Sequence, residues 1–476
     1  MPPEANAVVS DEKNNYENID DTLPPQYTNL SHPHKSFLDK ILVTYVFGFF
    51  LNVKGFLLHS PTEETPERKT YLEWIRTRLL TMELPGVKNL VKQWARDHGC
   101  EMAECHYQVP RKVNILQEWG IVNNGDEEIL DPSSIKFQPN DHVHTVVRFP
   151  SSLLSEEDLQ NWSGDPKDLH ENGALKLNQL DFSKLTKDVP LVVYFHGGGL
   201  VMGFPDTLAL AEDAYNLASD FKKQHGDETI RKMITVSVDY GIAPDCPFPA
   251  GIIDALSVID HILKADPNRN IAIYGMSAGG NIAMVAGLEA FRKYASRIFS
   301  VSVIVPMLSP ASDSRSYYMN EYSGGIAPVS WLRWAWRAYL QLDAPPNEEE
   351  EDDVPNMDNH KDRVKELLRK NSNHSSWTKS KWYASKTIRR LIEPIHDLPS
   401  GLDQETAPTF LVATNAADPL LDDGKSIFDS LKKAGAKVNY IECPGSHFMG
   451  YKLDKEYEQK RRDLLSEQIW KKDLAT

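Results

Sequence analysis

The chain contains 476 residues, of which 41% are hydrophobic, so it can bury a sizeable core. Its formal net charge of −16 disfavours nucleic acid as a partner, because a surface that binds phosphate needs clustered lysine and arginine. The four cysteines lack the spacing of metal ligands and are too few for a disulfide scaffold in so long a chain, so we expect a reducing, cytoplasmic location.

The N-terminal segment opens polar and acidic, without the basic start and apolar centre of a signal peptide. We predict a disordered acidic tail over residues 1–34 and helices over residues 35–100. Within the latter, residues 41–58 are mostly apolar but are interrupted at Asn52 and Lys54. Because a membrane span needs about 20 mostly apolar residues, a buried or interfacial helix is predicted here, and membrane association stays open.

The next informative segment is an apolar run over residues 191–195 that reads as a buried strand. It leads directly into a histidine and three glycines, which are His196, Gly197, Gly198 and Gly199. A plain turn would explain one or two glycines. Three in a row leave the backbone N–H groups free to point at a ligand oxygen, and with the N–H of Ala278 they would form an oxyanion hole. We predict a structural rather than a catalytic role for His196.

A second apolar run, over residues 270–274, precedes the pattern G-x-S-x-G and a helix-like stretch over residues 281–291. This order of strand, turn and helix is the context of a nucleophile elbow, in which a sharp turn presents Ser277. Gly275 and Gly279 stand where the strand and the helix pass too closely for side chains. The pentapeptide can also arise by chance in a glycine-rich turn, but with the upstream glycines it indicates acyl-transfer chemistry.

About a hundred residues separate the strands predicted at residues 299–305 and 409–414, far more than a crossover between parallel strands requires. We therefore predict an inserted cap over residues 311–405. Its first helix, residues 331–340, carries Trp331 and Trp334 on one face. These rings belong either to the core of the cap or to its apolar underside.

An acidic run of six residues, 348–353, divides this insertion. Like charges in a row repel one another and bury nothing, so we predict a solvated loop rather than a metal site. A second helix of the insertion is expected around residues 362–370. The chain has no P-loop, no dinucleotide fingerprint and no internal repeat.

Two later segments supply an acid and a base in the order that an elbow-type hydrolase requires. The strand predicted at residues 409–414 is followed by Asp418, and a strand over residues 437–442 is followed by His447. Of the 15 histidines, His447 alone lies after the last strand and before a terminal helix. A hydrogen-bonded loop histidine without a catalytic role is the alternative.

The choice of the acid has rivals nearby. Asp418 could serve only as a helix cap, because Pro419 suits the first position of a helix. Asp422 and Asp423 fall in the first turn of that helix, where the macrodipole stabilises carboxylates. The position after the strand favours Asp418.

Three motifs together resemble the hormone-sensitive-lipase-like branch of the α/β-hydrolases: H-G-G-G at residues 196–199, D-Y-G-I-A-P-D-C-P-F-P-A at residues 239–250, and G-M-S-A-G-G at residues 275–280. The resemblance runs from about Val143 to the C-terminal helix. The resemblance implies a mainly parallel central sheet flanked by helices, with a helical cap to which residues 35–100 contribute. It also implies roles for six residues: Ser277 as nucleophile, Asp418 and His447 as its partners, and Gly197, Gly198 and Ala278 as oxyanion donors. Met276 departs from the family, which usually has Asp or Thr there, and this puts the substrate preference in doubt.

The chain is therefore expected to be a serine carboxylic-ester hydrolase that acts through an acyl-enzyme on small-molecule esters of hydrophobic alcohols or acids, without a cofactor. The hydrolase core is expected in two parts, residues 101–310 and 406–476. A non-catalytic small-molecule receptor on the same fold and an amidase or deacetylase of the same family are the alternatives. The oligomeric state is not predicted.

Overall fold

The computed structural model describes residues 102–122, 130, 132–139, 141–150, 189–203, 205, 233–320, 327, 329–342, 372–445, 447 and 455–470. The predicted tail and N-terminal helices, the acidic run and the helix expected around residues 362–370 lie outside these ranges. Among the described residues, no helix is both long enough and apolar enough to cross a membrane.

The described strands form one eight-stranded sheet in the order β1-β2-β4-β3-β5-β6-β7-β8. Their bounds are β1 (Met102–Pro110), β2 (His142–Pro150), β3 (Leu191–Phe195), β4 (Ile234–Val238), β5 (Ile271–Met276), β6 (Ile298–Ile304), β7 (Thr409–Asn415) and β8 (Val438–Cys443). The pairs β1–β2 and β2–β4 are antiparallel, and all other pairs are parallel. The central strands are buried on both faces, which is why their sequences are nearly continuous apolar runs.

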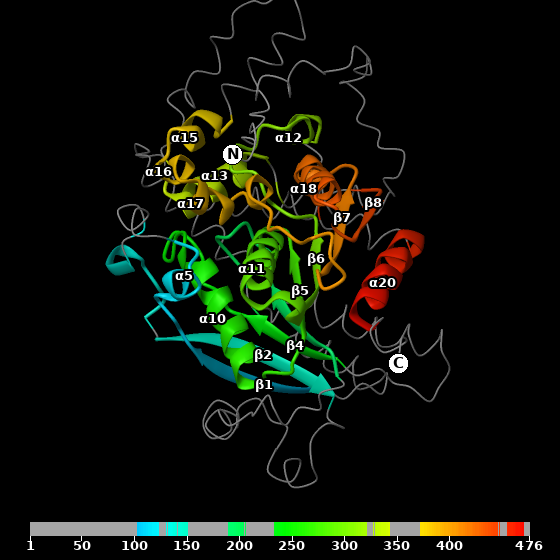
Figure 1. Cartoon of the computed structure of the whole chain (residues 1–476). Coiled ribbons are helices and arrows are strands. Elements are labelled where there is room, and N and C mark those ends of the chain that lie inside the picture. The colour runs from blue at the N-terminus through cyan, green and yellow to red at the C-terminus, as the bar shows by residue number, and fades with distance from the viewer. Residues whose placement is uncertain are drawn as a thin grey trace, which may run out of the picture.

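Long helices cover both faces of this sheet (Figure 1). The helices α10 (Ala250–Ala265), α11 (Ala278–Tyr294) and α18 (Leu421–Lys433) bury their apolar side chains in one large core cluster. The last helix, α20 (Lys455–Trp470), contributes Leu465 and Ile469 to a second cluster. This cluster also contains the side chains of the central strands that point away from the first cluster. The mainly parallel sheet flanked by helices is the predicted α/β-hydrolase architecture.

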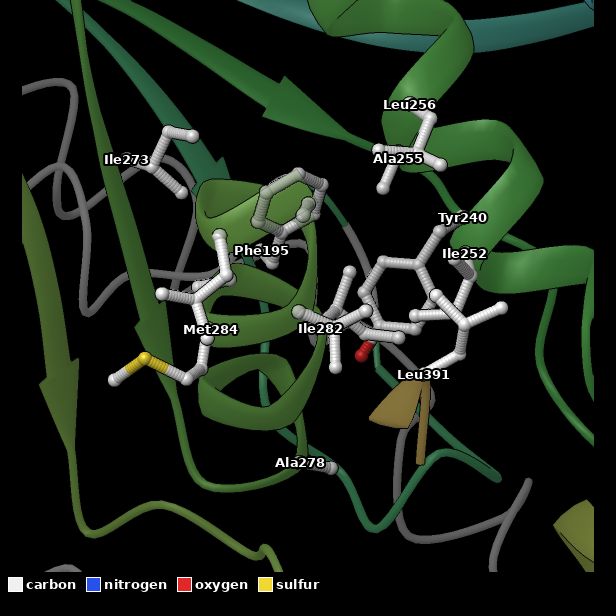
Figure 2. Close-up of a cluster of buried hydrophobic side chains, with 14 of the residues drawn as sticks. Phe195, Tyr240, Ile252, Ala255, Leu256, Ile273, Ala278, Ile282, Met284 and Leu391 are labelled. Atoms are coloured by element: carbon white, nitrogen blue, oxygen red, sulfur yellow. The ribbon is translucent and has the colours of Figure 1, made fainter. Parts of the chain in front are cut away.

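The large cluster anchors the elements that carry the site. Figure 2 shows Phe195 from the end of β3 and Ile282 from α11 among Tyr240 and the α10 side chains. Residues 278–291 of α11 are all buried, so the first turns of this helix are enclosed by protein. Burial of this kind fixes the end of β3 and the start of α11 relative to each other.

The insertion between β6 and β7 is helical in its described parts. It contains α12 (Arg315–Met319), α13 (Val329–Leu340), α15 (His374–Thr378), α16 (Lys381–Ala384), α17 (Lys386–Arg390) and the short η7 (Pro394–His396). The helix predicted at residues 331–340 is α13. Its C-terminal end is tied down where Tyr339 O accepts the N–H of Phe248 at 2.8 Å and Leu340 O accepts the indole N–H of Trp382 at 2.7 Å.

The strand order determines where a site can form. The chain passes from β3 to its neighbour β4 and then crosses to β5 on the other side of β3. In an open parallel sheet, ligands bind beside the carboxyl ends of the strands at such a switch point. The loop that follows β3 and the turn that follows β5 meet there.

Candidate active site

The turn between β5 and α11 places Ser277 in an uncommon backbone conformation, with φ 56° and ψ −122°. Positive φ is rare for a residue other than glycine and is retained only where the surroundings enforce it. Here the N–H of Ser277 donates to Ile304 O at 2.8 Å, and Ser277 O accepts the N–H of Met307 at 3.0 Å. The end of β6 therefore holds the serine in place.

The glycines on either side of Ser277 lie where the sequence predicted close approach. A Cβ atom at Gly279 would lie 2.1 Å from Phe195 O, and one at Gly275 would lie 2.1 Å from Gly279 O. Both obstacles are backbone atoms, which cannot move aside. Only glycine at these two positions allows the strand and the helix to meet in this way.

Ser277, His447 and Asp418 form a continuous chain of hydrogen bonds. The distance from Ser277 Oγ to His447 Nε2 is 2.9 Å, and that from His447 Nδ1 to Asp418 Oδ2 is 2.7 Å. An ionised carboxylate only accepts hydrogen bonds, so Nδ1 carries the proton and Nε2 accepts the serine O–H. None of the three residues is more than 2% exposed. The low-dielectric surroundings strengthen each electrostatic interaction within this chain.

Asp418 is fixed by a second contact, since its Oδ1 accepts the N–H of Leu420 at 2.9 Å. Helix α18 begins only at Leu421. The interpretation of Asp418 as nothing more than a helix cap is therefore wrong, because its other oxygen faces His447. The rival carboxylates point elsewhere: Asp422 Oδ2 accepts the N–H of Ser316 at 2.7 Å, and Asp423 faces the segment after β6.

The glycine loop after β3 lies against the serine. A Cβ atom at Gly197 would be 3.2 Å from Ser277 Cβ. Among the backbone hydrogen bonds between described residues outside helices and strands, none has the N–H of Gly197, Gly198, Gly199 or Ala278 as its donor. The last of these stands at the start of α11, where the helix macrodipole adds positive potential. The arrangement offers several donors to one developing negative charge.

Contacts of His196 hold the glycine loop in place. Its ring stacks on Tyr240 with centroids 4.3 Å apart, its Nδ1 donates to Gly197 O at 2.8 Å, and Tyr240 Oη donates to His196 O at 2.6 Å. Burial lowers the pKa of His196, so the ring is neutral. These contacts fit the structural role that the sequence predicted for this histidine.

The cap helix α13 reaches the same loop through Trp331. A Cβ atom at Gly199 would lie 2.4 Å from Trp331 Cη2, and Gly199 has φ +63°. Trp334, which the sequence placed on the same face, is 8% exposed and belongs to the large core cluster. The two tryptophans therefore differ in their surroundings, and Trp331 is the one that lies against the glycine loop.

Met276, the departure from the family pattern, is 3% exposed. It belongs to the second cluster, with Ile304, Cys443 and Leu465. Its side chain thus packs toward the α20 side of the sheet, and the apolar surroundings explain why a methionine fits there.

Asp423 has the most perturbed carboxyl near the site. Burial raises its pKa to about 8, against the opposing effect of hydrogen bonds from Leu308 N at 2.8 Å, Ser309 N at 3.0 Å and Tyr317 Oη at 3.2 Å. All three donors belong to the segment that leaves β6. Asp423 therefore joins the first turn of α18 to the start of the insertion.

We expect Asp423 to make the stability of the protein depend on pH. Its folded pKa, about 8, lies above the ordinary value of 3.8, so the stabilisation linked to its proton is complete below about pH 4 and is lost as pH rises to about 8. Asp423→Asn removes this titration. Between about pH 5 and pH 8, the unfolding free energy of the variant should rise relative to wild type by at most about 1.4 kcal/mol per pH unit. Urea unfolding of both proteins at several pH values checks this, and a constant difference would contradict it.

Two side chains that were not predicted from the sequence hold the loops of the acid and the base. Asn415 and Asn320 donate from their amides to the backbone of these loops. The sequence offers one indication of this role, which is that Asn415 lies three residues before Asp418. In the part of the chain that the structure describes, no group of three His, Cys, Asp or Glu side chains could hold a metal ion.

Comparison with known proteins identifies the same kind of domain. Residues 192–351 match a family model described as alpha/beta hydrolase fold. Carboxylesterase NlhH of Mycobacterium tuberculosis is 28% identical over 265 residues, which cover 54% of this chain and 65% of that protein. Esterase LipI of the same species is 29% identical over 259 residues, which cover 53% of this chain and 62% of that protein. The chain thus spans less than two thirds of the length of either relative.

Among solved structures, a hyperthermophilic esterase from the archaeon Pyrobaculum calidifontis is similar to this chain with a TM-score of 0.48 and 18% identity. The match covers 89% of this chain and 98% of that one.

Proposed function

We propose that this chain is a serine carboxylic-ester hydrolase of the esterase or lipase type, because residues 192–351 match a family model described as alpha/beta hydrolase fold and carry the serine of the site described above. Its substrates are small-molecule esters of hydrophobic alcohols or acids. The observation that carries the proposal is the hydrogen-bonded chain from Ser277 through His447 to Asp418 at the turn between β5 and α11. The esterase names of the two relatives support the same reaction class.

In the first half of the reaction, His447 Nε2 takes the proton of Ser277 as Oγ attacks the ester carbonyl carbon. The carbonyl oxygen becomes an oxyanion, which accepts hydrogen bonds from the backbone N–H groups of the glycine loop and of Ala278. Asp418 keeps the proton on Nδ1 and stabilises the imidazolium. His447 then gives its proton to the departing alkoxide, which leaves as an alcohol.

In the second half, water attacks the acyl-serine carbonyl while His447 accepts a proton from that water. The oxyanion forms again in the same place, and its collapse releases the carboxylic acid and returns the proton to Ser277 Oγ. Only groups of the protein and one water take part, so the mechanism needs no cofactor. The buried surroundings of Ser277 and His447, both at most 2% exposed, favour these charge-stabilising contacts.

The direct test combines turnover with covalent labelling. A panel of p-nitrophenyl esters of increasing acyl length should be hydrolysed, and an activated phosphonate should stop turnover by modifying one residue, which peptide mapping identifies as Ser277. Anilides of the same acids separate amide from ester preference. Binding of the esters without any turnover or phosphonylation would instead mean a receptor, and the proposed function would be wrong.

The contact between Gly199 and Trp331 allows a prediction about the glycine loop after β3. In Gly199→Ala the new methyl group would overlap the indole, whose nearest atom lies 2.4 Å away. Because a rigid ring cannot fold aside, we expect the loop to shift. The kcat for a p-nitrophenyl ester should fall about 10- to 100-fold, and adding Trp331→Ala should restore part of the loss.

A matched control separates overlap from backbone strain. Gly120 has a similar φ of +70°, but a Cβ atom there would meet nothing within 4 Å. We expect Gly120→Ala to share the cost of a positive φ and to keep kcat near wild type. Equal kcat values in wild type and Gly199→Ala would show that the contact with Trp331 does not constrain the loop.

A further inference from the structure

Asn415, the last residue of β7, is attached to the backbone of the catalytic base. Its side-chain Nδ2 donates to His447 O at 2.9 Å, and the residue is 1% exposed. A backbone carbonyl can only accept a hydrogen bond, so the amide nitrogen of Asn415 must be the atom that faces it. The side chain of His447 is held by Asp418 and its main chain by Asn415.

The loops that follow β7 and β8 are hydrogen-bonded to each other beyond the ends of the strands. Asn415 pairs with Cys443 in the ladder, the N–H of Ala416 donates to Cys443 O at 2.8 Å, and that of Ala417 donates to Gly445 O at 2.9 Å. The contact from Asn415 to His447 continues this series and brings the second loop back toward the first. The acid and base loops therefore form one unit.

Asn320, directly after α12, reaches the same unit from the insertion. Its Nδ2 donates to Asp418 O at 2.9 Å and to Ala416 O at 3.3 Å, and the residue is 6% exposed. Ser316 adds a contact from the same helix, with its Oγ donating to Pro419 O at 2.6 Å. The backbone of the acid loop is thus held from one side by β8 and from the other by α12.

We propose that Asn415 and Asn320 are positioning residues that set the placement of the His447–Asp418 pair relative to Ser277, an inference that rests on the proposed esterase function. Each amide donates to a backbone carbonyl and not to a reacting atom, so each acts through His447 or Asp418. A misplacement of about 1 Å in a catalytic group can cost about 100-fold in rate. Loss of the hydrogen bond from either asparagine therefore lowers kcat and leaves KM nearly unchanged.

The test replaces Asn415 by leucine, which has a similar size but no donor. Its matched control is Asn373→Leu, because Asn373 is also buried, at 0% exposure, and also donates from Nδ2 to a backbone carbonyl, that of Arg333 at 2.9 Å. Asn373 lies between α13 and α15, within the insertion. Both variants lose a buried hydrogen bond from an amide to a backbone carbonyl, and Asn373→Leu also loses the hydrogen bond that Asn373 Oδ1 accepts from Arg337 at 3.3 Å. A general effect on folding should therefore appear in both, as a drop in the midpoint of thermal unfolding.

The measured quantities are kcat and KM for a p-nitrophenyl ester, the rate of phosphonylation of Ser277, and the pH at which kcat/KM is half maximal. In Asn415→Leu we expect kcat and the phosphonylation rate to fall together by about 10- to 100-fold, KM to stay within about threefold, and the half-maximal pH to move. Asn373→Leu should keep all four near wild type. The inference is overturned if Asn415→Leu keeps kcat and the half-maximal pH of wild type, or if Asn373→Leu changes them equally.

Asn320→Ala provides a second, independent variant in case Asn415→Leu does not fold. It removes the two hydrogen bonds that Asn320 donates to the acid loop. It should reduce kcat and the phosphonylation rate in the same pattern, whereas wild-type values would contradict the proposal. Failure of the function itself is distinguishable, because wild type would then show neither turnover nor phosphonylation. If wild type is active and labelled at Ser277 while Asn415→Leu and Asn320→Ala match it, only the positioning role is wrong.

Discussion

Replacing Ser277 by alanine is expected to lower kcat for ester hydrolysis by about a million-fold and to abolish phosphonylation. The reason is that the serine oxygen forms the covalent bond to the acyl group, and loss of a residue that works as part of such a unit costs nearly all of its contribution. The oxyanion donors remain in place, so a small residual rate above the uncatalysed reaction is expected. Initial rates with a p-nitrophenyl ester, measured at high enzyme concentration, provide the test.

The matched control is Ser302→Ala. Ser302 lies on β6, is 2% exposed like Ser277, and donates to Gln468 Oε1 at 3.0 Å on the α20 side of the sheet. We expect this variant to keep kcat near wild type and to be phosphonylated normally. Hydrolysis by Ser277→Ala at the wild-type rate would show that Ser277 is not the nucleophile, whatever the geometry around it.

The second large effect is expected for Asp418→Asn, which should reduce kcat on the order of 10⁴-fold. The amide keeps the shape of the carboxylate but presents an N–H₂ group or a neutral oxygen to His447 Nδ1, now 2.7 Å from Asp418 Oδ2. The tautomer with its proton on Nε2 becomes available, and that tautomer cannot accept the serine proton. Loss of the negative charge also leaves the imidazolium without its partner. KM should change little.

Two neighbouring carboxylates serve as controls for this variant. Asp422 and Asp423 lie in the first turn of α18, yet their oxygens accept hydrogen bonds from Ser316 and Leu308. We expect Asp422→Asn and Asp423→Asn to keep kcat within several-fold of wild type. If Asp418→Asn were nearly as active as wild type and one of these two variants inactive, the acid would be misassigned, although the fold and the nucleophile would stand.

Most of the parallel strands of the sheet could be predicted from the sequence. The strands β3, β5, β6, β7 and β8 were predicted within one or two residues. In β3 and β5 the signal is a nearly continuous apolar run, as expected for parallel strands that are covered on both faces. Other strands were missed. β4 is five residues long and contains Thr235 and Ser237, and β1 mixes polar with apolar residues, so neither is a continuous apolar run.

The candidate site was accessible to sequence reasoning to the extent that its chemistry lies in short segments. The turn at Ser277, the three glycines after β3, and the order of Asp418 and His447 are local patterns or simple facts of chain order. A tight turn between a strand and a helix needs small residues at fixed positions, so the residue types alone identify it. The same reasoning could not choose between Asp418 and its neighbours by side-chain direction.

The contacts across long separations were decided only by the tertiary structure. Three contacts join segments that are far apart in the chain. They are the hydrogen bond between Asp418 and His447, the approach of Trp331 to Gly199, and the hydrogen bond from Asn320 to the acid loop. By itself the sequence determined the local backbone conformations and the inventory of reactive groups, because steric limits on glycine and serine and the burial of apolar runs act between near neighbours. Which buried donor meets which acceptor depends on how helices and strands pack, and packing is a property of the assembled sheet and cap rather than of any one segment.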